Sequence, residues 1–127
     1  MRTINRILVA NRGEIALRVC RTATDMGIAT IAVYADQDVA APHTREADEA
    51  LSLGGDDTAS TYLNGEKILA IALETGADAI HPGYGFLSEN SEFARAVEDA
   101  GIAWLGPASS VIDALGDKIK ARRVAEA

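Results

Sequence analysis

A four-residue pattern occurs three times in this chain of 127 residues, and it constrains the fold more than any other feature. Asp25 to Ile28, Glu74 to Ala77 and Asp99 to Ile102 each read acidic residue, any residue, glycine, apolar residue. A glycine at this position commonly terminates a helix, and the apolar residue after it can begin a strand. Helices and strands are therefore expected to alternate, which predicts parallel strands joined by right-handed crossovers.

The apolar segments between these glycines predict an α/β fold, an open and mostly parallel sheet of about five strands with helices on both faces. Strands are expected at 7–10, 28–34, 50–53, 77–80 and 102–105, and helices at 14–26, 65–74, 93–100 and 109–115. The stretch 35–48 is polar and is expected to be a surface loop without regular structure. Residues 1–115 are predicted to form one domain, and 116–127 to begin a connection to a further domain.

Charge and cysteine usage exclude several classes of protein. The net charge is −7, whereas nucleic-acid binding needs clustered basic residues. No apolar run approaches the roughly 20 residues of a membrane span. Cys20 is the single cysteine, so no internal disulfide can form, and a cytoplasmic location is expected. Neither His43 nor His81 has a second histidine or cysteine at metal-ligand spacing, so no metal site is expected within the chain.

The turn after the first expected strand reads Asn11-Arg12-Gly13-Glu14. Dinucleotide-binding domains carry the glycine pattern G-x-G-x-x-G at this place, but here only Gly13 is present. The side chains of Asn11 and Arg12 fill the space that a pyrophosphate needs, which disfavours a dinucleotide site. The simpler interpretation is that Asn11 and Glu14 satisfy backbone donors at the start of the helix.

The expected helix 14–26 has an apolar and a charged side. Its apolar stripe is Ile15, Val19, Thr22 and Met26, flanked by Ala16, Cys20 and Ala23, so Cys20 is interpreted as a small buried residue and not as a nucleophile. Its charged stripe is Glu14, Arg18, Arg21 and Asp25. That stripe is either a solvent-exposed face of weak ion pairs or a polar contact face for another subunit.

The run His81 to Asn90 is the strongest candidate for function, because it follows an apolar segment and is rich in glycine. Ligands of open α/β sheets bind at the carboxyl ends of strands, where this loop is expected to lie. Tyr84 and Phe86 are interpreted either as core residues that fold the loop back or as a ligand-binding wall. His81 is expected to fix the loop by bonding backbone carbonyls, and Ser88 or Asn90 to cap the next helix.

These segments together resemble the N-terminal domain of biotin carboxylase, the ATP-dependent component of biotin-dependent carboxylases. The resemblance covers residues 6–120 almost without gaps. It is carried by Ile7 to Ala16, Arg45 to Ala50, His81 to Asn90 and Gly116-Asp117-Lys118, in the order of the family, with Tyr62-Leu63 and Leu105-Gly106-Pro107 also matching.

The resemblance implies a Rossmann-like domain that precedes an ATP-grasp domain. The parent enzyme would use ATP and Mg²⁺ to activate bicarbonate as carboxyphosphate and would carboxylate biotin. Lys118 matches the family lysine that contacts the ATP phosphates, and Tyr84, Gly85 and Phe86 match the loop that faces biotin and bicarbonate. Arg18, Arg21 and Asp25 fall on the helix that meets the partner subunit of a homodimer, although the family often has Glu where this chain has Asp25.

No catalytic residue is implied within the chain, because the family's magnesium-binding acids and bicarbonate-handling basic residues are expected beyond Ala127. The 127 residues alone are therefore expected to be inactive. The implied partners are the chain's own ATP-grasp domain, a biotin carboxyl carrier domain and a carboxyltransferase subunit. An acyl-CoA carboxylase α subunit is favoured, with pyruvate and urea carboxylases left open. The alternatives are a self-associating interaction module and an unrelated nucleotide-binding α/β domain.

Overall fold

A computed structural model describes residues 4–106, and they form a five-stranded sheet in which all neighbouring strands are parallel. The strand order is β3-β2-β1-β4-β5. The strands are β1 (Arg6–Val9), β2 (Ala29–Tyr34), β3 (Glu49–Ser52), β4 (Ala79–His81) and β5 (Ala103–Trp104). The expected helix 109–115, the domain limit at 115 and Lys118 lie outside the described residues.

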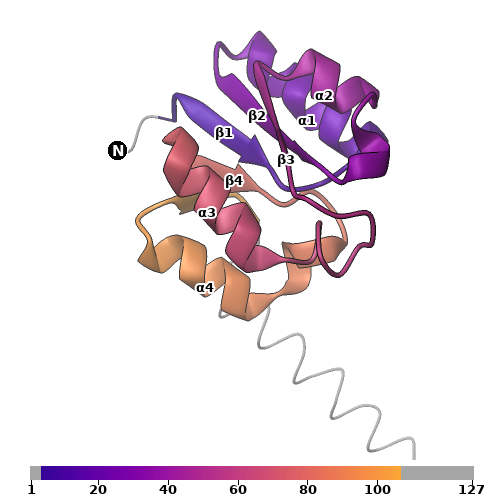
Figure 1. The fold of residues 1–127 in the computed structure, drawn as a ribbon. Coiled ribbons are helices and arrows are strands. Elements are labelled where there is room, and N and C mark those ends of the chain that lie inside the picture. The colour runs from indigo at the N-terminus through magenta and orange to yellow at the C-terminus, as the bar shows by residue number, and fades with distance from the viewer. Residues whose placement is uncertain (1–3, 107–127) are drawn as a thin grey trace, which may run out of the picture.

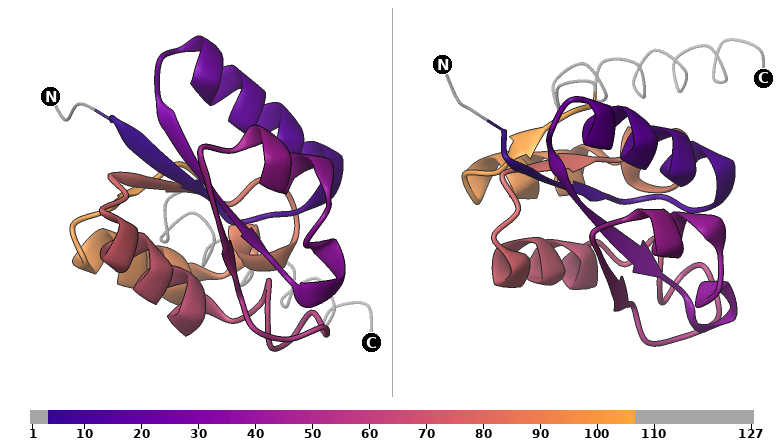
Figure 2. Two further views of the ribbon diagram at one scale, coloured as in Figure 1. Left: turned by 45° about the horizontal axis from the view of Figure 1, so that its top comes forward. Right: turned by 90° about the horizontal axis from the view of Figure 1, so that it is seen from above.

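Helices cover both faces of this sheet, which confirms the predicted fold class. The elements are α1 (Gly13–Asp25), α2 (Pro42–Glu46), α3 (Gly65–Thr75) and α4 (Ser91–Asp99), with short 3-10 turns η1 (Asp36–Asp38) and η2 (Phe86–Glu89). Figures 1 and 2 show α1 and α2 on one face and α3 and α4 on the other. None of the helices within residues 4–106 is long and apolar enough to cross a membrane.

The central strand β1 carries apolar side chains on both faces of the sheet because helices cover both faces. Ile7 and Val9 pack toward α1, whereas Leu8 lies in the larger cluster beneath α3 and α4. Successive side chains of a strand point to opposite faces, so an uninterrupted apolar run suits a strand buried on both. The predicted helix stops are confirmed, since Gly27, Gly76 and Gly101 have φ values of 77°, 73° and 81°.

The polar stretch 35–48 is not the irregular loop that its composition predicts. It contains η1 and the single-turn helix α2, which begins at Pro42. Proline is favoured in the first turn of a helix because its missing N–H has no intrahelical partner there. His43 is fully buried, and its Nε2 lies 3.2 Å from the carbonyl oxygen of Val33. A five-residue helix is too short to show a helical period, so this element could not be read from the pattern.

The apolar face of α1 is also displaced from the expected stripe. Ala16, Cys20 and Ala23 are the buried residues, whereas Met26 at the end of the predicted stripe is 70 % exposed. Small side chains let the helix backbone approach the sheet closely, and they therefore form the contact. The larger Ile15 and Val19 are only half-buried and lie beside that contact.

Candidate functional site

The candidate site lies where β1 and β4 end side by side. The chain proceeds from β1 through β2 to β3 in one direction and then returns to place β4 on the opposite side of β1. In open α/β sheets, such a reversal leaves a crevice outside the carboxyl ends of the two strands, and ligands bind there. The turn Asn11–Gly13 and the glycine-rich loop His81–Asn90 both emerge at this edge, joined by the hydrogen bond from the Ala10 N–H to the His81 carbonyl at 2.9 Å.

Asn11 fills the crevice and holds the loop. Its side chain is 1 % exposed, and Nδ2 donates to the carbonyl oxygens of Pro82 at 2.8 Å and Tyr84 at 2.7 Å. Its Oδ1 accepts from the Arg12 N–H at 2.8 Å. The expectation that Asn11 serves the start of the helix is thus only partly correct, because its amide nitrogen binds the loop. The buried amide of Asn11 thus lies in the turn where dinucleotide-binding domains hold a pyrophosphate.

Gly83 allows this close approach between the loop and Asn11. Its φ is +66°, a conformation that costs other residues free energy, and a Cβ there would lie 2.7 Å from Asn11 Nδ2 and 2.9 Å from Ile15 Cγ2.

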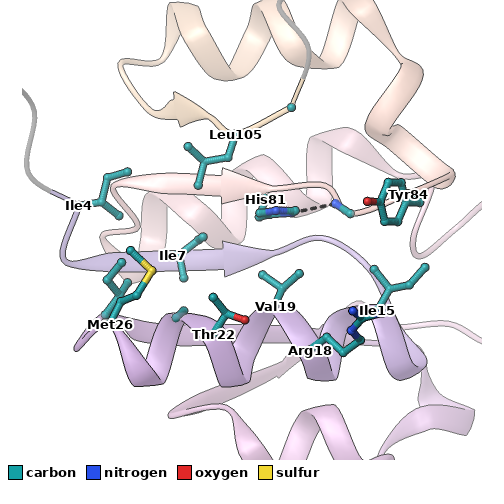
Figure 3. A pocket seen from close by; sticks show the side chains of 14 residues that line it. Ile4, Ile7, Ile15, Arg18, Val19, Thr22, Met26, His81, Tyr84 and Leu105 are labelled. Atoms are coloured by element: carbon teal, nitrogen blue, oxygen red, sulfur yellow. Dashed lines mark hydrogen bonds between the residues drawn. The ribbon is translucent and has the colours of Figure 1, made fainter.

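His81 closes the turn through a hydrogen bond that differs from the one expected. Its Nδ1 accepts from the Gly83 N–H at 3.0 Å, so the ring bonds a backbone donor and not a carbonyl (Figure 3). Burial lowers the pKa of His81, which favours the neutral ring that this acceptor role requires.

The three predicted loop residues face different surroundings. Tyr84 is 79 % exposed, so its ring extends from the loop while its carbonyl is held by Asn11. Gly85 has open space within 4 Å of the position that a Cβ would take. Phe86 turns inward and packs against Tyr62 with ring centroids 5.4 Å apart. Phe86 therefore folds the loop back as one interpretation predicted, whereas the exposure of Tyr84 contradicts that interpretation for Tyr84. A role of Tyr84 in a ligand-binding wall stays a prediction.

The backbone of Phe86 is strained, with a φ of 47° that is rare for a bulky side chain. Such a conformation costs about 1–3 kcal/mol and persists only where the surroundings impose it. Here the hydrogen bond from the Ser88 N–H to the Gly85 carbonyl, at 2.9 Å, and the contact with Tyr62 impose it. Leu87 and Ser88 are buried behind it. The loop is therefore preformed.

A polar cluster that the sequence did not indicate supports the same edge. Arg12 makes a bidentate ion pair with Asp38, with Nε to Oδ2 at 2.8 Å and Nη2 to Oδ1 at 2.6 Å. The Tyr62 hydroxyl donates to Asp38 Oδ2 at 2.6 Å and accepts from the Ala35 N–H at 3.0 Å. Because Tyr62 also contacts Phe86, the cluster connects the end of β2 to the glycine-rich loop. Its sequence signals are the matches to the family of Ile7 to Ala16, which include Arg12, and of Tyr62-Leu63.

The protonation states of this cluster follow from its contacts. Burial opposes ionisation of Asp38, but the hydrogen bonds from Arg12 and Tyr62 outweigh it and lower the carboxyl pKa. Burial and the bond to Asp38 raise the pKa of Tyr62 to about 12. The cluster is thus an ionised pair beside a neutral phenol. With His81 also neutral, the described edge is suited to binding and positioning.

The charged stripe of α1 is exposed as expected, but its pairing differs. Arg21 pairs with Glu46 of α2 at 3.3 Å, and none of the ion pairs within residues 4–106 joins two members of the stripe. Arg18 and Asp25 are exposed.

On the opposite side of α1, Cys20 is fully buried, which confirms its interpretation as a core residue. Across the described part of the chain, three or more His, Cys, Asp or Glu residues nowhere gather as a metal-binding group.

This arrangement matches a known family along most of the chain. Residues 3–112 fit the family model described as biotin carboxylase, N-terminal domain, and the chain belongs to that family. The biotin-dependent acyl-coenzyme A carboxylase alpha3 subunit of Mycobacterium leprae is 57 % identical over 122 residues, which are 96 % of this chain and 20 % of that protein. The present chain thus spans about a fifth of that relative.

Solved structures share the fold closely. The biotin carboxylase subunit of a pyruvate carboxylase superposes with a TM-score of 0.88 at 51 % identity, over 96 % of this chain and 27 % of that one. The biotin carboxylase domain dimer of the Hydrogenobacter thermophilus 2-oxoglutarate carboxylase, solved with MgADP, ADP and bicarbonate, gives a TM-score of 0.84 at 49 % identity, over 89 % of this chain and 25 % of that one. The predicted family and fold are confirmed.

Proposed function

We propose that this chain forms the N-terminal domain of a biotin-dependent carboxylase, whose biotin carboxylase reaction uses ATP, Mg²⁺ and bicarbonate to carboxylate biotin. The observation that carries the proposal is the preformed loop at the β1–β4 edge, in a chain that belongs to the biotin carboxylase N-terminal family. The 2-oxoglutarate carboxylase domain solved with MgADP and bicarbonate supports the choice of cosubstrates. In the whole enzyme, bound ATP would supply the phosphoryl group that activates bicarbonate, and Mg²⁺ would neutralise the charge on the ATP phosphates.

The proposed role of the described residues is to provide one wall of the site. Tyr84 offers an exposed ring, and the open space beside Gly85 lets a ligand or another domain approach the backbone. Phe86 anchors the loop against Tyr62. Biotin and bicarbonate are proposed to face this wall, with Lys118 contacting the ATP phosphates. We assign no chemical step to any of the 127 residues, and we therefore expect no turnover from the 127 residues alone.

The proposed partners are the ATP-grasp domain of the same enzyme, a biotin carboxyl carrier domain, a carboxyltransferase subunit and a second copy of the biotin carboxylase. The exposed positions of Arg18, Arg21 and Asp25 on α1 are compatible with a dimer contact, and the 2-oxoglutarate carboxylase domain is a dimer. A cytoplasmic location is part of the proposal. The acceptor proposed is an acyl-CoA, because the relative from M. leprae is an acyl-coenzyme A carboxylase subunit.

A chimera tests the function directly. Residues 1–127 would replace the matching segment of the M. leprae carboxylase subunit, which is 57 % identical over 122 residues. We expect the chimera to retain ATP cleavage that depends on bicarbonate and biotin, within about tenfold of the parent. A chimera that folds and assembles but shows no biotin-dependent ATP cleavage would contradict the proposal. The 127-residue chain assayed alone is the matched control, and it should show no turnover above background.

The role of Lys118 is tested in the same chimera. Lys118→Ala should raise the KM for ATP, because a cation that contacts the phosphates is lost. Lys120→Ala is the matched control, since it removes an equal charge two positions away and should leave the KM for ATP unchanged. Equal KM values in the two variants would remove Lys118 from the nucleotide site.

A further inference from the structure

His43 is the one residue of α2 that is buried, although the helix is otherwise polar. Pro42, Arg45 and Glu46 are exposed, and Thr44 is half-buried. A helix of five residues has almost no stability of its own, because helix nucleation is unfavourable and few backbone bonds follow it. The place of α2 beside α1 (Figure 1) therefore depends on the contacts that its few anchored side chains make.

Two side chains of α2 bond to other elements within the described part of the chain. Glu46 pairs with Arg21 of α1 at 3.3 Å, but their side chains are 45 % and 60 % exposed, and such surface pairs contribute little. His43 makes the other bond, with Nε2 lying 3.2 Å from the carbonyl oxygen of Val33 in β2. The buried imidazole is therefore the main side-chain anchor of α2 on the sheet.

The contact with Val33 determines which nitrogen of the ring carries hydrogen. A carbonyl oxygen only accepts, so Nε2 of His43 carries a hydrogen and donates it. In the neutral ring Nδ1 then has no hydrogen, and it is buried without a hydrogen-bond partner among residues 4–106. A proton on Nδ1 would place a charged N–H in the core without an acceptor, which costs more free energy than an unpaired lone pair. The geometry thus accommodates the neutral ring and disfavours the charged one.

The charged groups nearest in effect do not compensate for that cost. Asp38 of η1 favours a charged ring, whereas Arg12 opposes it. Both oxygens of Asp38 already accept, Oδ1 from Arg12 and Oδ2 from Arg12 and Tyr62. Burial is the largest effect on His43, and it lowers the pKa of the ring below its ordinary value of 6.5.

The other titratable groups on α2 and on the elements that pack against it do not hydrogen-bond the ring. Besides the pair of Arg21 and Glu46, they include Cys20 of α1, Tyr34 of β2, Arg45 of α2, Glu49 of β3 and Asp48 just before it. Arg45, Asp48 and Glu49 are exposed, and burial keeps the Cys20 thiol neutral by raising its pKa to about 11. A proton taken up by His43 therefore finds no acceptor in the described part of the closed domain.

We propose that His43 is a pH-sensitive switch, which holds α2 on the sheet while the ring is neutral and releases α2 when Nδ1 binds a proton. A charged ring is solvated only when α2 leaves the sheet, and the exposed pair of Arg21 and Glu46 does little to oppose that movement. Asp38 lies just before α2 in the chain, so release occurs next to the cluster that supports the glycine-rich loop. The switch belongs to the domain itself and does not depend on the proposed enzymatic function.

The direction of the pH dependence follows from the burial of the ring. The pKa of His43 is lower in the closed domain than in the released segment, where it returns to about 6.5. The closed form is therefore fully favoured above about pH 6.5, and its advantage is lost as the pH falls toward the lower, closed-state pKa. Between these two values the equilibrium constant for release rises by up to about tenfold per pH unit, because one proton is taken up.

NMR of the full 127-residue chain with ¹⁵N-labelled histidine rings tests the proposal. At pH 7 we expect the neutral ring of His43 with hydrogen on Nε2, and a titration midpoint below about 6.5. Amide exchange supplies the second measurement, with protection corrected for the intrinsic rate at each pH. Protection of Thr44 and Ala47, whose N–H groups bond within 41–47, should fall between pH 6.5 and 5, by up to about tenfold per pH unit. Ala103, whose N–H bonds across the sheet to the Asp78 carbonyl, should keep its protection.

Two variants separate His43 from other titrations. His43→Gln retains an N–H donor near the position of Nε2 and cannot bind a proton in this range, so protection of Thr44 and Ala47 should be independent of pH. His81→Asn is the matched control, because it removes the other histidine of the chain and keeps a side-chain acceptor near Gly83. This variant should show the pH dependence of the wild type.

Three outcomes would overturn the proposal. A His43 ring that is charged at pH 7, or that carries hydrogen on Nδ1 alone, contradicts the assigned contact. A ring that titrates while protection of Thr44 and Ala47 stays constant shows that α2 is not released. Both results come from the wild-type chain and decide the matter even if His43→Gln does not fold. The third outcome is an equal pH dependence of protection in the wild type and His43→Gln, which would assign the effect to another group.

Discussion

The amide nitrogen of Asn11 lies 2.7 Å from the carbonyl oxygen of Tyr84, which is 73 positions further along the chain. This bond and its companion to Pro82 span Gly83, so one buried side chain determines the course of the glycine-rich loop. The exposed ring of Tyr84 is thereby presented from a rigid backbone.

Asn11→Ala is expected to destabilise the domain and release this loop. The substitution leaves the Pro82 and Tyr84 carbonyls without their donor, and unsatisfied buried groups cost about 1–3 kcal/mol. Urea unfolding should report a loss in that range, and amide hydrogen exchange should accelerate at 83–88. Asn5→Ala, at an exposed asparagine before β1, is the control. Unchanged exchange at 83–88 in the Asn11 variant would show that the bonds do not hold the loop.

The ion pair of Arg12 and Asp38 predicts a defined pH dependence. The pKa of the Asp38 carboxyl is lower in the folded chain than its ordinary value. Its contribution to the free energy of unfolding is therefore complete above the unfolded pKa of about 3.9 and is lost as the pH falls through the folded pKa. Asp38→Asn should therefore reduce the free energy of unfolding by about 2 kcal/mol at pH 6–7. The difference from wild type should narrow below about pH 4. Asp56→Asn, at an exposed aspartate, is the control and should change the free energy of unfolding at pH 6–7 by less than about 0.5 kcal/mol.

A difference between wild type and Asp38→Asn that stayed constant from pH 7 to pH 2.5 would contradict this assignment. It would mean that the hydrogen bonds from Arg12 and Tyr62 do not favour the ionised carboxylate. Tyr62→Phe provides a second comparison, because it removes one of those bonds and the acceptor for the Ala35 N–H while retaining the ring against Phe86.

Lys67 is expected to stabilise the loop between β3 and α3. Its Nζ donates to the carbonyl oxygens of Leu53, Gly54 and Ser60 at 2.8, 3.1 and 3.2 Å. Lys67→Met keeps most of the stem and removes the donors, so we expect a loss of about 1–2 kcal/mol in urea unfolding and faster exchange at 54–61. Glu66→Gln, at the exposed neighbour, should change stability by less than about 0.5 kcal/mol. Equal effects in the two variants would contradict a role for the ammonium group.

Cys20 is expected to be almost unreactive in the folded protein. Burial raises the pKa of its thiol to about 11, and the side chain is fully enclosed. Because the thiolate is the reactive form, an aromatic disulfide reagent at pH 8 should label the folded chain at least about 100-fold more slowly than the chain in urea. Equal rates in both conditions would show that the α1 contact with the sheet opens freely.

The number of strands, their parallel direction and the helix-ending glycines could be predicted, because each follows from a local pattern, whereas the strand order β3-β2-β1-β4-β5 was not predicted. Asn64 and Asn90 accept from the N–H groups of Lys67 and Phe93, as helix capping predicts. The partners of Asn11 could not be predicted, since its bonds reach 71 and 73 positions along the chain. The burial of His43 was missed for a similar reason, because its environment comes from the packing of α2 over β2 and not from its polar neighbours in the sequence.

The account depends most on Tyr84 acting through its exposed ring and not through the stability of the domain. Its most direct test is kcat/KM for biotin-dependent ATP cleavage by the chimera carrying Tyr84→Ala, compared with Leu73→Ala, another exposed apolar residue outside the site. We predict that both variants unfold within about 0.5 kcal/mol of the parent. We predict also that Tyr84→Ala alone lowers kcat/KM, by about tenfold or more, which corresponds to about 1.4 kcal/mol. Equal kcat/KM values for Tyr84→Ala and Leu73→Ala would contradict the account.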